Sequence, residues 1–267
     1  MPAVQLARLK IQVDQLVWQF TRPQDFQRGL KNLLETYADW SYRPGEAIEP
    51  GSLLPAYHVP LLLLHQIEQQ LARQCQEMAA AALALADALW LDEYFEPRLL
   101  AAFILGQIPL KPIEEISRRI LAWSDASADK QIQETIFSQA TLRLRRENPA
   151  AWLEIINTWL TASSLASKVM GLRALASLLE DREFEDLPGA FNMLQPLMLT
   201  APARLHGDLL QVLQIISRRS PVETTHFLRQ VLSGTNSSIP ARLVRQILPS
   251  LSPELQASLR RSLAARS

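Results

Sequence analysis

The chain has 267 residues, of which 48% are hydrophobic and 20% are charged, and its formal net charge is zero. These proportions exclude a disordered chain and a membrane-embedded one, and the single Cys75 excludes an intramolecular disulfide. Residues 1–20 do not resemble a signal peptide, and the apolar stretch Met78–Leu91 is too short to span a bilayer, so we expect a soluble, cytoplasmic protein.

Helical patterns run along the whole chain, and we expect residues 1–267 to form a single all-α domain. The N-terminal third, residues 1–91, is irregular. Its predicted elements are helices at 3–20 and 24–40, a loop at Ser41–Gly51 rich in Pro, Gly and Glu, and a long helical region from about Val59 to Leu91. Because Cys75 falls inside that helical region, we expect a packed thiol rather than a nucleophile.

From residue 97 onward, prolines recur 32 to 39 residues apart, and each opens a helical stretch that follows another helical stretch. These prolines are Pro112, Pro149, Pro188, Pro221 and Pro253. A period of about 30–45 residues without strand signals is typical of stacked helix pairs. The predicted pairs are 97–108 with 112–123, 129–146 with 149–161, 165–180 with 188–199, 204–218 with 221–232, and 240–249 with 253–264. The chain is therefore predicted to be an α-α superhelix, a HEAT-like repeat solenoid.

Three of these prolines follow a residue that favours the N-cap position, namely Asn148, Ser220 and Ser252. The cap side chain accepts hydrogen bonds from free backbone N–H groups, and proline at the first helical position loses no hydrogen bond. Ser220 and Glu223 also match a capping box. Pro112 and Pro188 lack a good cap residue before them.

The zero net charge conceals an asymmetry between the two parts of the chain. Residues 204–267 contain nine Arg and three acidic residues, giving +6, and the preceding residues balance them with −6. The planar guanidinium group suits pairing with phosphate or carboxylate. The alternative is that the high arginine content reflects genomic composition and solvated helix faces.

Three collinear passages resemble the HEAT-like DNA alkylation repair family. They are Tyr57-His58-Val59-Pro60, the run Ala88–Ala102 with its Leu-Trp and Glu-Pro-Arg elements, and Ser217–Glu223 followed by Phe227-Leu228. The resemblance implies helix pairs around a concave, basic groove that holds duplex DNA, and excision of alkylated bases such as 3- or 7-methylpurines. It also implies that cationic and aromatic residues at the starts of successive first helices carry the reaction.

The sequence departs from that family pattern at the positions expected to react. Trp123 and Asp129 keep a Trp and an Asp at a different separation, Lys168 stands where the family usually has Arg, and residues 204–218 contain no Trp. We therefore expect a divergent member that binds a macromolecule without glycosylase activity. Two alternatives remain: an active glycosylase that uses Trp123, Asp129 and Lys168, and a protein–protein interaction module.

The candidate residues each have a structural alternative. Trp123 and Asp129 are catalytic candidates, with Trp123 stacking on a base and Asp129 stabilising positive charge on the sugar. In the alternative, Trp123 continues the apolar stripe from Ile120 and Asp129 caps the next helix. The candidates for nucleic-acid binding are cationic, and they are Arg143, Arg145, Arg146, Lys168, Arg173, Arg218 and Arg219.

Several of these cations lie at predicted helix ends, where they would also complement the negative end of the helix macrodipole. No cofactor is expected, and the four histidines show no ligand spacing, so no metal site is predicted. The acidic segment Glu180–Asp186 is expected to be a solvated loop. The partners that this reading allows are duplex DNA on the concave face or another protein.

Overall fold

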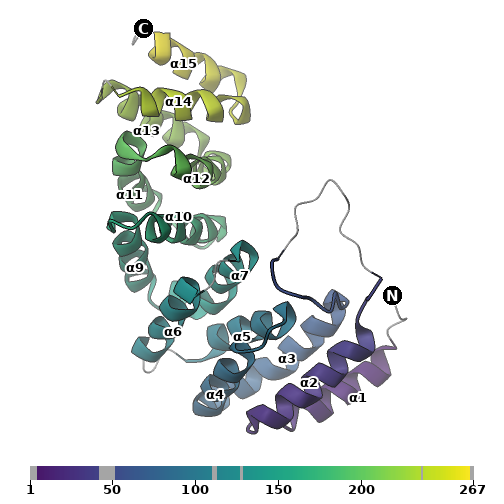
Figure 1. Ribbon diagram of the computed structural model, residues 1–267. Coiled ribbons are helices and arrows are strands. Elements are labelled where there is room, and N and C mark those ends of the chain that lie inside the picture. The colour runs from purple at the N-terminus through teal and green to yellow at the C-terminus, as the bar shows by residue number, and fades with distance from the viewer. Residues whose placement is uncertain (1–4, 42–51, 110–112, 127–128, 236, 265–267) are drawn as a thin grey trace. The chain divides into compact units, whose positions relative to one another are not determined.

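The computed structural model describes residues 5–41, 52–109, 113–126, 129–235 and 237–264 (Figure 1). Over these ranges the chain is helical and contains no strand, which confirms the all-α prediction. It forms two compact units, Met1–Pro149 and Ala150–Ser267. Residues 42–51 of the predicted Ser41–Gly51 loop, and Pro112, lie outside the described residues.

Unit 1 is built from helices that pack in two layers. The elements are α1 (Leu6–Val17), α2 (Pro23–Tyr37), α3 (Leu61–Glu77), α4 (Ala79–Trp90), α5 (Phe95–Gln107), α6 (Ile113–Ala126), α7 (Lys130–Thr135), the π-helix η1 (Ile136–Ala140) and α8 (Leu142–Glu147). In one layer α1 packs on α3, α3 on α5, and α5 on α7, η1 and α8. In the other, α2 packs on α4. Alternation of helix pairs thus begins at α1, earlier than the sequence pattern indicated.

Two predicted helices of unit 1 are interrupted. The region from Val59 to Leu91 breaks at Met78, whose φ of −127° and ψ of 59° end α3 and precede α4. The predicted helix 129–146 consists of α7, η1 and α8. Its π-helical turn lies where α5 comes closest, because a Cβ added to Gly106 would be 2.0 Å from the Gln139 carbonyl oxygen. A glycine in α5 thus permits a backbone contact that no other residue would allow.

Unit 2 repeats the two-layer arrangement (Figure 1). Its elements are α9 (Pro149–Thr161, whose first residue belongs to unit 1), α10 (Leu165–Glu180), α11 (Leu187–Thr200), the 3₁₀ turn η2 (Ala203–Leu205), α12 (His206–Arg219), α13 (Pro221–Ser233), α14 (Ser238–Ile247), the 3₁₀ turn η3 (Leu248–Ser250) and α15 (Pro253–Ala264). In one layer α12 packs between α10 and α14, and in the other α13 packs between α11 and α15. Each predicted pair from 165 to 264 is present.

Helix capping follows a different pattern from the predicted one. Ser220 makes no side-chain bond to the backbone of α13, so the predicted capping box is wrong in its main feature; instead its hydroxyl donates to the Glu223 carboxylate. That hydrogen bond lowers the pKa of Glu223. At α11 the cap is Asp186, which accepts from the Gly189 N–H at 2.9 Å. The sequence pattern missed it because α11 begins one residue before Pro188.

Candidate functional site

Asp129, one of the two catalytic candidates, is the N-cap of α7. Its side chain is 5% exposed and accepts a hydrogen bond from the Ile132 N–H at 2.9 Å. It also accepts from the Ser52 hydroxyl at 2.6 Å and from the Leu53 N–H. The carboxylate therefore fixes the start of α7 and holds the segment at Ser52 against it. This is the capping role that the sequence offered as the alternative.

The hydrogen bonds to Asp129 decide its protonation. Burial alone would raise the pKa of this carboxyl, but the bonds from Ser52, Ile132 and Leu53 favour the charged form and outweigh burial, so the pKa lies below its ordinary value. Asp129 is thus a carboxylate at neutral pH. Its charge is balanced by hydrogen-bond donors of the chain itself.

Trp123, the second catalytic candidate, is 6% exposed and stacks on Trp90. The ring centroids are 4.5 Å apart and the planes differ by 7°. Trp90 also lies against Arg98, whose guanidinium carbon is 5.4 Å from the ring centroid. Trp123 therefore continues the apolar stripe of α6, as the structural alternative proposed, and one face of its indole is already covered.

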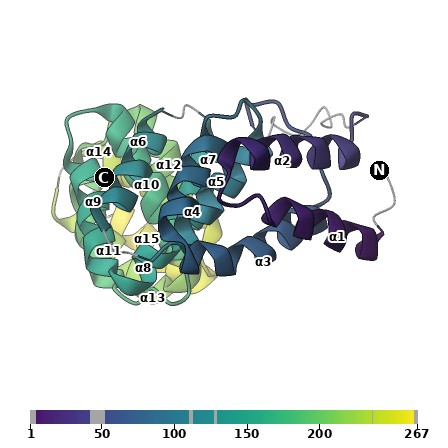
Figure 2. The ribbon, with the colours of Figure 1, turned by 90° about the horizontal axis from the view of Figure 1, so that it is seen from below.

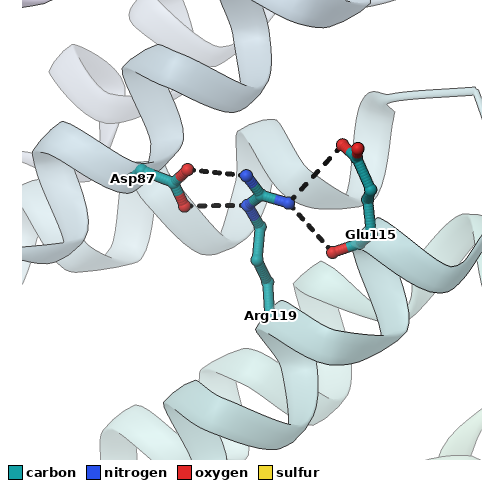
Figure 3. A network of polar contacts seen from close by, with 3 residues as sticks. All are labelled: Asp87, Glu115 and Arg119. Carbon is teal, nitrogen blue, oxygen red and sulfur yellow. Dashed lines mark hydrogen bonds and ion pairs between the residues drawn. The ribbon is translucent and has the colours of Figure 1, made fainter.

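Trp90 belongs to α4 and Trp123 to α6, and an ion-pair network also joins these two helices (Figure 3). The sequence pattern did not reveal it. Nε and Nη2 of Arg119 donate to the two carboxylate oxygens of Asp87 at 2.8 and 2.7 Å. Nη1 donates to the Glu115 carbonyl at 3.0 Å and lies 3.8 Å from the Glu115 carboxylate. The bond to Asp87 is the largest cause of the raised pKa of Arg119. Asp87 precedes Trp90, and Arg119 precedes Trp123, by one helical turn, and this spacing is the signal that could have located the network.

Two of the three cationic candidates of α8 contact their own segment. Arg143 forms an ion pair with Glu147 at 3.3 Å, and Arg145 donates to the Ser138 carbonyl at 2.9 Å. Arg145 and Arg146 lie in the last turn of α8, where positive charge complements the macrodipole. The structure thus gives Arg143 and Arg145 intrahelical or adjacent partners.

Arg219, at the end of α12, binds the segment that follows α10. Its guanidinium donates to four backbone carbonyls, those of Leu179, Asp181, Arg182 and Phe184. The bonds to Leu179 and Asp181 measure 3.1 and 2.7 Å. Arg219 therefore satisfies the carbonyls left free at the C-terminus of the neighbouring first helix. Arg218, one position earlier, is exposed.

The two cations of α10 lie in different surroundings. Arg173 pairs with Asp208, in the first turn of α12, at 3.2 Å, and both side chains are about one-fifth exposed. Lys168 is half-buried, and no described carboxylate lies within ion-pair distance of it. The structure thus brings Arg173 of one first helix to Asp208 of the next, which compensates its charge.

Two exposed arginines of α14, Arg242 and Arg245, were absent from the sequence-based candidates. They are three residues apart and lie opposite the buried Leu243, Val244 and Ile247. Their i, i+3 spacing on an amphipathic helix is the signal that could have found them. Within the described part of the chain, no carboxylate comes within 4 Å of Arg218, Arg242 or Arg245.

Residues 60–245, well over half of the chain, match the family model described as DNA alkylation repair enzyme. The chain belongs to the DNA alkylation repair family. No curated protein and no solved structure matches it.

Two of the passages that resemble the DNA alkylation repair family contact each other in the structure. The buried carboxylate of Glu96, in the first turn of α5, accepts from the N–H groups of Tyr57 and His58 at 3.1 and 2.8 Å. Tyr57 also stacks on Tyr94 at 4.2 Å, and burial raises its pKa to about 12. His58, with a φ of 53°, adopts the left-handed backbone region, which is uncommon for a residue other than glycine. These contacts hold the two passages together, so the residues described have a structural role.

The described residues of this family member contain no group of three or more His, Cys, Asp or Glu side chains placed to hold a metal ion. None of the helices in the described ranges is long and apolar enough to cross a membrane. Cys75 is fully buried, and burial raises the pKa of its thiol to about 12, which suits a packed residue rather than a nucleophile.

Proposed function

We propose that this member of the DNA alkylation repair family is a HEAT-like scaffold that binds duplex DNA and does not excise bases through Trp123 and Asp129. The proposal that bases are not excised through these residues rests on one observation, the use of the Asp129 carboxylate as a helix cap and loop anchor. Membership of the DNA alkylation repair family supports the proposal of duplex DNA binding.

Base excision needs a carboxylate that can face the positive charge developing on the sugar as the glycosidic bond breaks. The oxygens of Asp129 instead accept hydrogen bonds from Ser52, Leu53 and Ile132, and the side chain is buried. Turning the carboxylate toward DNA would leave those donors without their partner, at a cost of about 1–3 kcal/mol for each buried group. A structural role for Asp129 is therefore favoured over a catalytic one.

An aromatic residue that stacks on a base needs an open ring face. Trp123 is buried and one of its faces is covered by Trp90. Exposing it would separate α4 from α6 and break the Arg119–Asp87 ion pair beside it. The stacking role implied by the family resemblance is accordingly not expected at this position.

The surface that we propose for DNA is formed by Arg218 on α12 and by Arg242 and Arg245 on α14, two helices that pack side by side. These arginines are exposed, and none has a described carboxylate in ion-pair range, so their guanidinium groups can pair with phosphates. We do not include Arg173 or Arg219, because Asp208 compensates the first and backbone carbonyls use the donors of the second.

The helix pairs support the HEAT-like part of the proposal. In each unit, first helices pack on first helices and second helices on second helices, as expected when every pair buries its apolar face on its neighbours. That the pairs continue as one solenoid domain, and that the arginines lie on its concave face, are parts of the proposal.

Binding is tested by fluorescence anisotropy of a labelled duplex over a range of salt concentrations. Because each phosphate contact contributes about 0.9 to the slope of log K against log salt, Arg242→Ala with Arg245→Ala should lower that slope by about 2. Affinity at low salt should fall at least tenfold. Arg229→Ala, an exposed arginine of α13 in the other layer, is the matched control and should leave binding unchanged.

A wild-type chain that does not bind duplex DNA, or binds it without salt dependence, would contradict the proposal and favour a protein-interaction module. A loss of binding free energy for Arg229→Ala that equals, per charge removed, the loss for the α14 variant would also contradict it, because it would show a non-specific effect of total charge.

A further inference from the structure

The first helix, α1, lies at one end of unit 1, where it packs on α2 and α3 (Figure 2). Its outward side carries two large apolar residues that are exposed, Ile11 at 60% and Trp18, the C-cap, at 84%. Terminal helices of repeat arrays normally have polar outer faces. The exposed residues of α2 fit that rule, since they include Gln24, Arg28, Lys31, Asn32 and Glu35.

The exposed residues of α1 have an order along the helix. Ile11 and Trp18 are seven residues apart, which is two turns, so they share one face. Lys10 and Asp14 are exposed, lie one turn apart, and follow one flank of that face. Trp18 also lines a cavity of about 430 Å³ between the ends of α1 and α3.

We propose that this face binds a second copy of the chain, with the two α1 helices packed antiparallel about a two-fold axis. An axis near residue 12 places Ile11 next to Ile11 of the other copy. It also sets each Lys10 beside the other copy's Asp14, because both residues lie on the same flank and the axis keeps that flank in place.

Self-complementarity is what identifies the occupant. In a two-fold interface residue i of one copy contacts j of the other, and j contacts i. The face of α1 provides such a pair in its charges, Lys10 with Asp14, and it places Ile11 near the axis, where Ile11 meets its own counterpart. An unrelated partner would require one member of the charge pair but has no need of both on the same helix.

The size of the patch sets the strength of the contact. A helix of 12 residues is about 18 Å long, and the face of one such helix buries less than the roughly 800 Å² per partner of a standard interface. The dimer should therefore be weak and should dissociate on dilution.

The test is sedimentation equilibrium of the full chain across the micromolar range. Wild type should shift with concentration from the mass of one chain, 30.1 kDa, toward twice that mass. Ile11→Glu should remain at one-chain mass throughout, with an unchanged circular dichroism spectrum because Ile11 is exposed. Lys31→Glu on α2 is the control for added negative charge and should dimerise like wild type.

Charge reversal gives the sharper result. Lys10→Glu alone should weaken the dimer because it sets Glu beside Asp, and Asp14→Lys alone should weaken it because it sets Lys beside Lys. The double variant Lys10→Glu with Asp14→Lys should restore dimerisation. A wild-type chain that stays at one-chain mass at the highest concentration would overturn the proposal, as would a double variant no stronger than either single one.

Discussion

At the scale of single residues, hydrogen bonds to the backbone decide what the charged side chains of this chain can do. Asp129, Glu96 and Arg219 would each be read as functional in isolation, and each satisfies backbone groups of a segment distant in sequence. The sequence allows a cap at Asp129 to be foreseen, because its partner Ile132 is three residues away. It does not allow the partners of Arg219 to be foreseen, since they lie 35 to 40 residues earlier.

Replacing Asp129 by alanine should destabilise the fold in a pH-dependent way. Loss of the cap costs about 1–2 kcal/mol, and loss of the bonds from Ser52 and Leu53 adds to that cost, so the thermal midpoint should fall by several degrees. Because the folded-state pKa of Asp129 is depressed, its contribution is fully present above the unfolded pKa of about 4 and is lost as the pH falls through the lower folded-state value. The difference between wild type and Asp129→Ala should therefore shrink on acidification from neutral pH.

Thermal melts monitored by circular dichroism at a series of pH values measure this difference. Asp125→Ala, at an exposed position of α6, is the matched control and should change the midpoint little at any pH. A difference that stays constant down to strongly acidic pH would show that the Asp129 charge contributes nothing to the cap.

Substitutions of Arg218 and Arg219 should affect different properties, duplex binding for Arg218 and fold stability for Arg219. Arg219→Ala removes four carbonyl contacts and should lower the thermal midpoint by the equivalent of about 2 kcal/mol, because hydrogen bonds from a charged group contribute about 1.5–3 kcal/mol. Arg218→Ala should leave the midpoint within the equivalent of about 0.5 kcal/mol and weaken duplex binding. Thermal melts and anisotropy on both variants measure stability and duplex binding. A destabilised Arg218→Ala together with an Arg219→Ala that loses only binding would contradict the roles given to the two arginines.

At the scale of helices, periodicity and proline positions gave most of the boundaries in unit 2, because an N-terminal proline and an apolar stripe are local signals. The two helix interruptions in unit 1, at Met78 and at η1, are not marked by any local sequence pattern. The π-helical turn η1 lies where one helix must fit against another, at Gly106 and Gln139. Such contacts depend on residues distant in sequence, which a single-sequence pattern cannot register.

Gly106→Ala should be strongly destabilising, although alanine is the better helix former. The added Cβ would lie 2.0 Å from the Gln139 carbonyl oxygen, a backbone atom, so α5 and η1 would have to move apart. We expect a cost of about 3 kcal/mol, at the upper end for overpacking. Gly207→Ala is the matched control, because a Cβ there meets nothing within 4 Å, and it should be neutral or stabilising by up to about 1 kcal/mol. Equal thermal midpoints for the two variants would refute the close contact.

At the scale of the whole molecule, the sequence indicated the all-α class, the stacked pairs and the family. It also located the positive charge in the C-terminal part, while leaving open which arginines are available. That question depends on tertiary contacts: Asp208 compensates Arg173, and carbonyls engage Arg219, whereas Arg242 and Arg245 remain exposed without a described ion-pair partner. Of the sequence-based candidates on α8, α10 and α12, the proposed surface therefore keeps Arg218 on α12 and adds Arg242 and Arg245 on α14.

We propose that this family member binds duplex DNA without excising alkylated bases through Trp123 and Asp129. The most direct measurement is release of methylated purines from an alkylated duplex, with protein in excess and at a concentration where anisotropy shows the duplex to be bound. We predict binding with no release above the protein-free rate. Release above that rate that is abolished in Asp129→Asn, a variant that keeps a good capping residue, would contradict this prediction and make Asp129 catalytic.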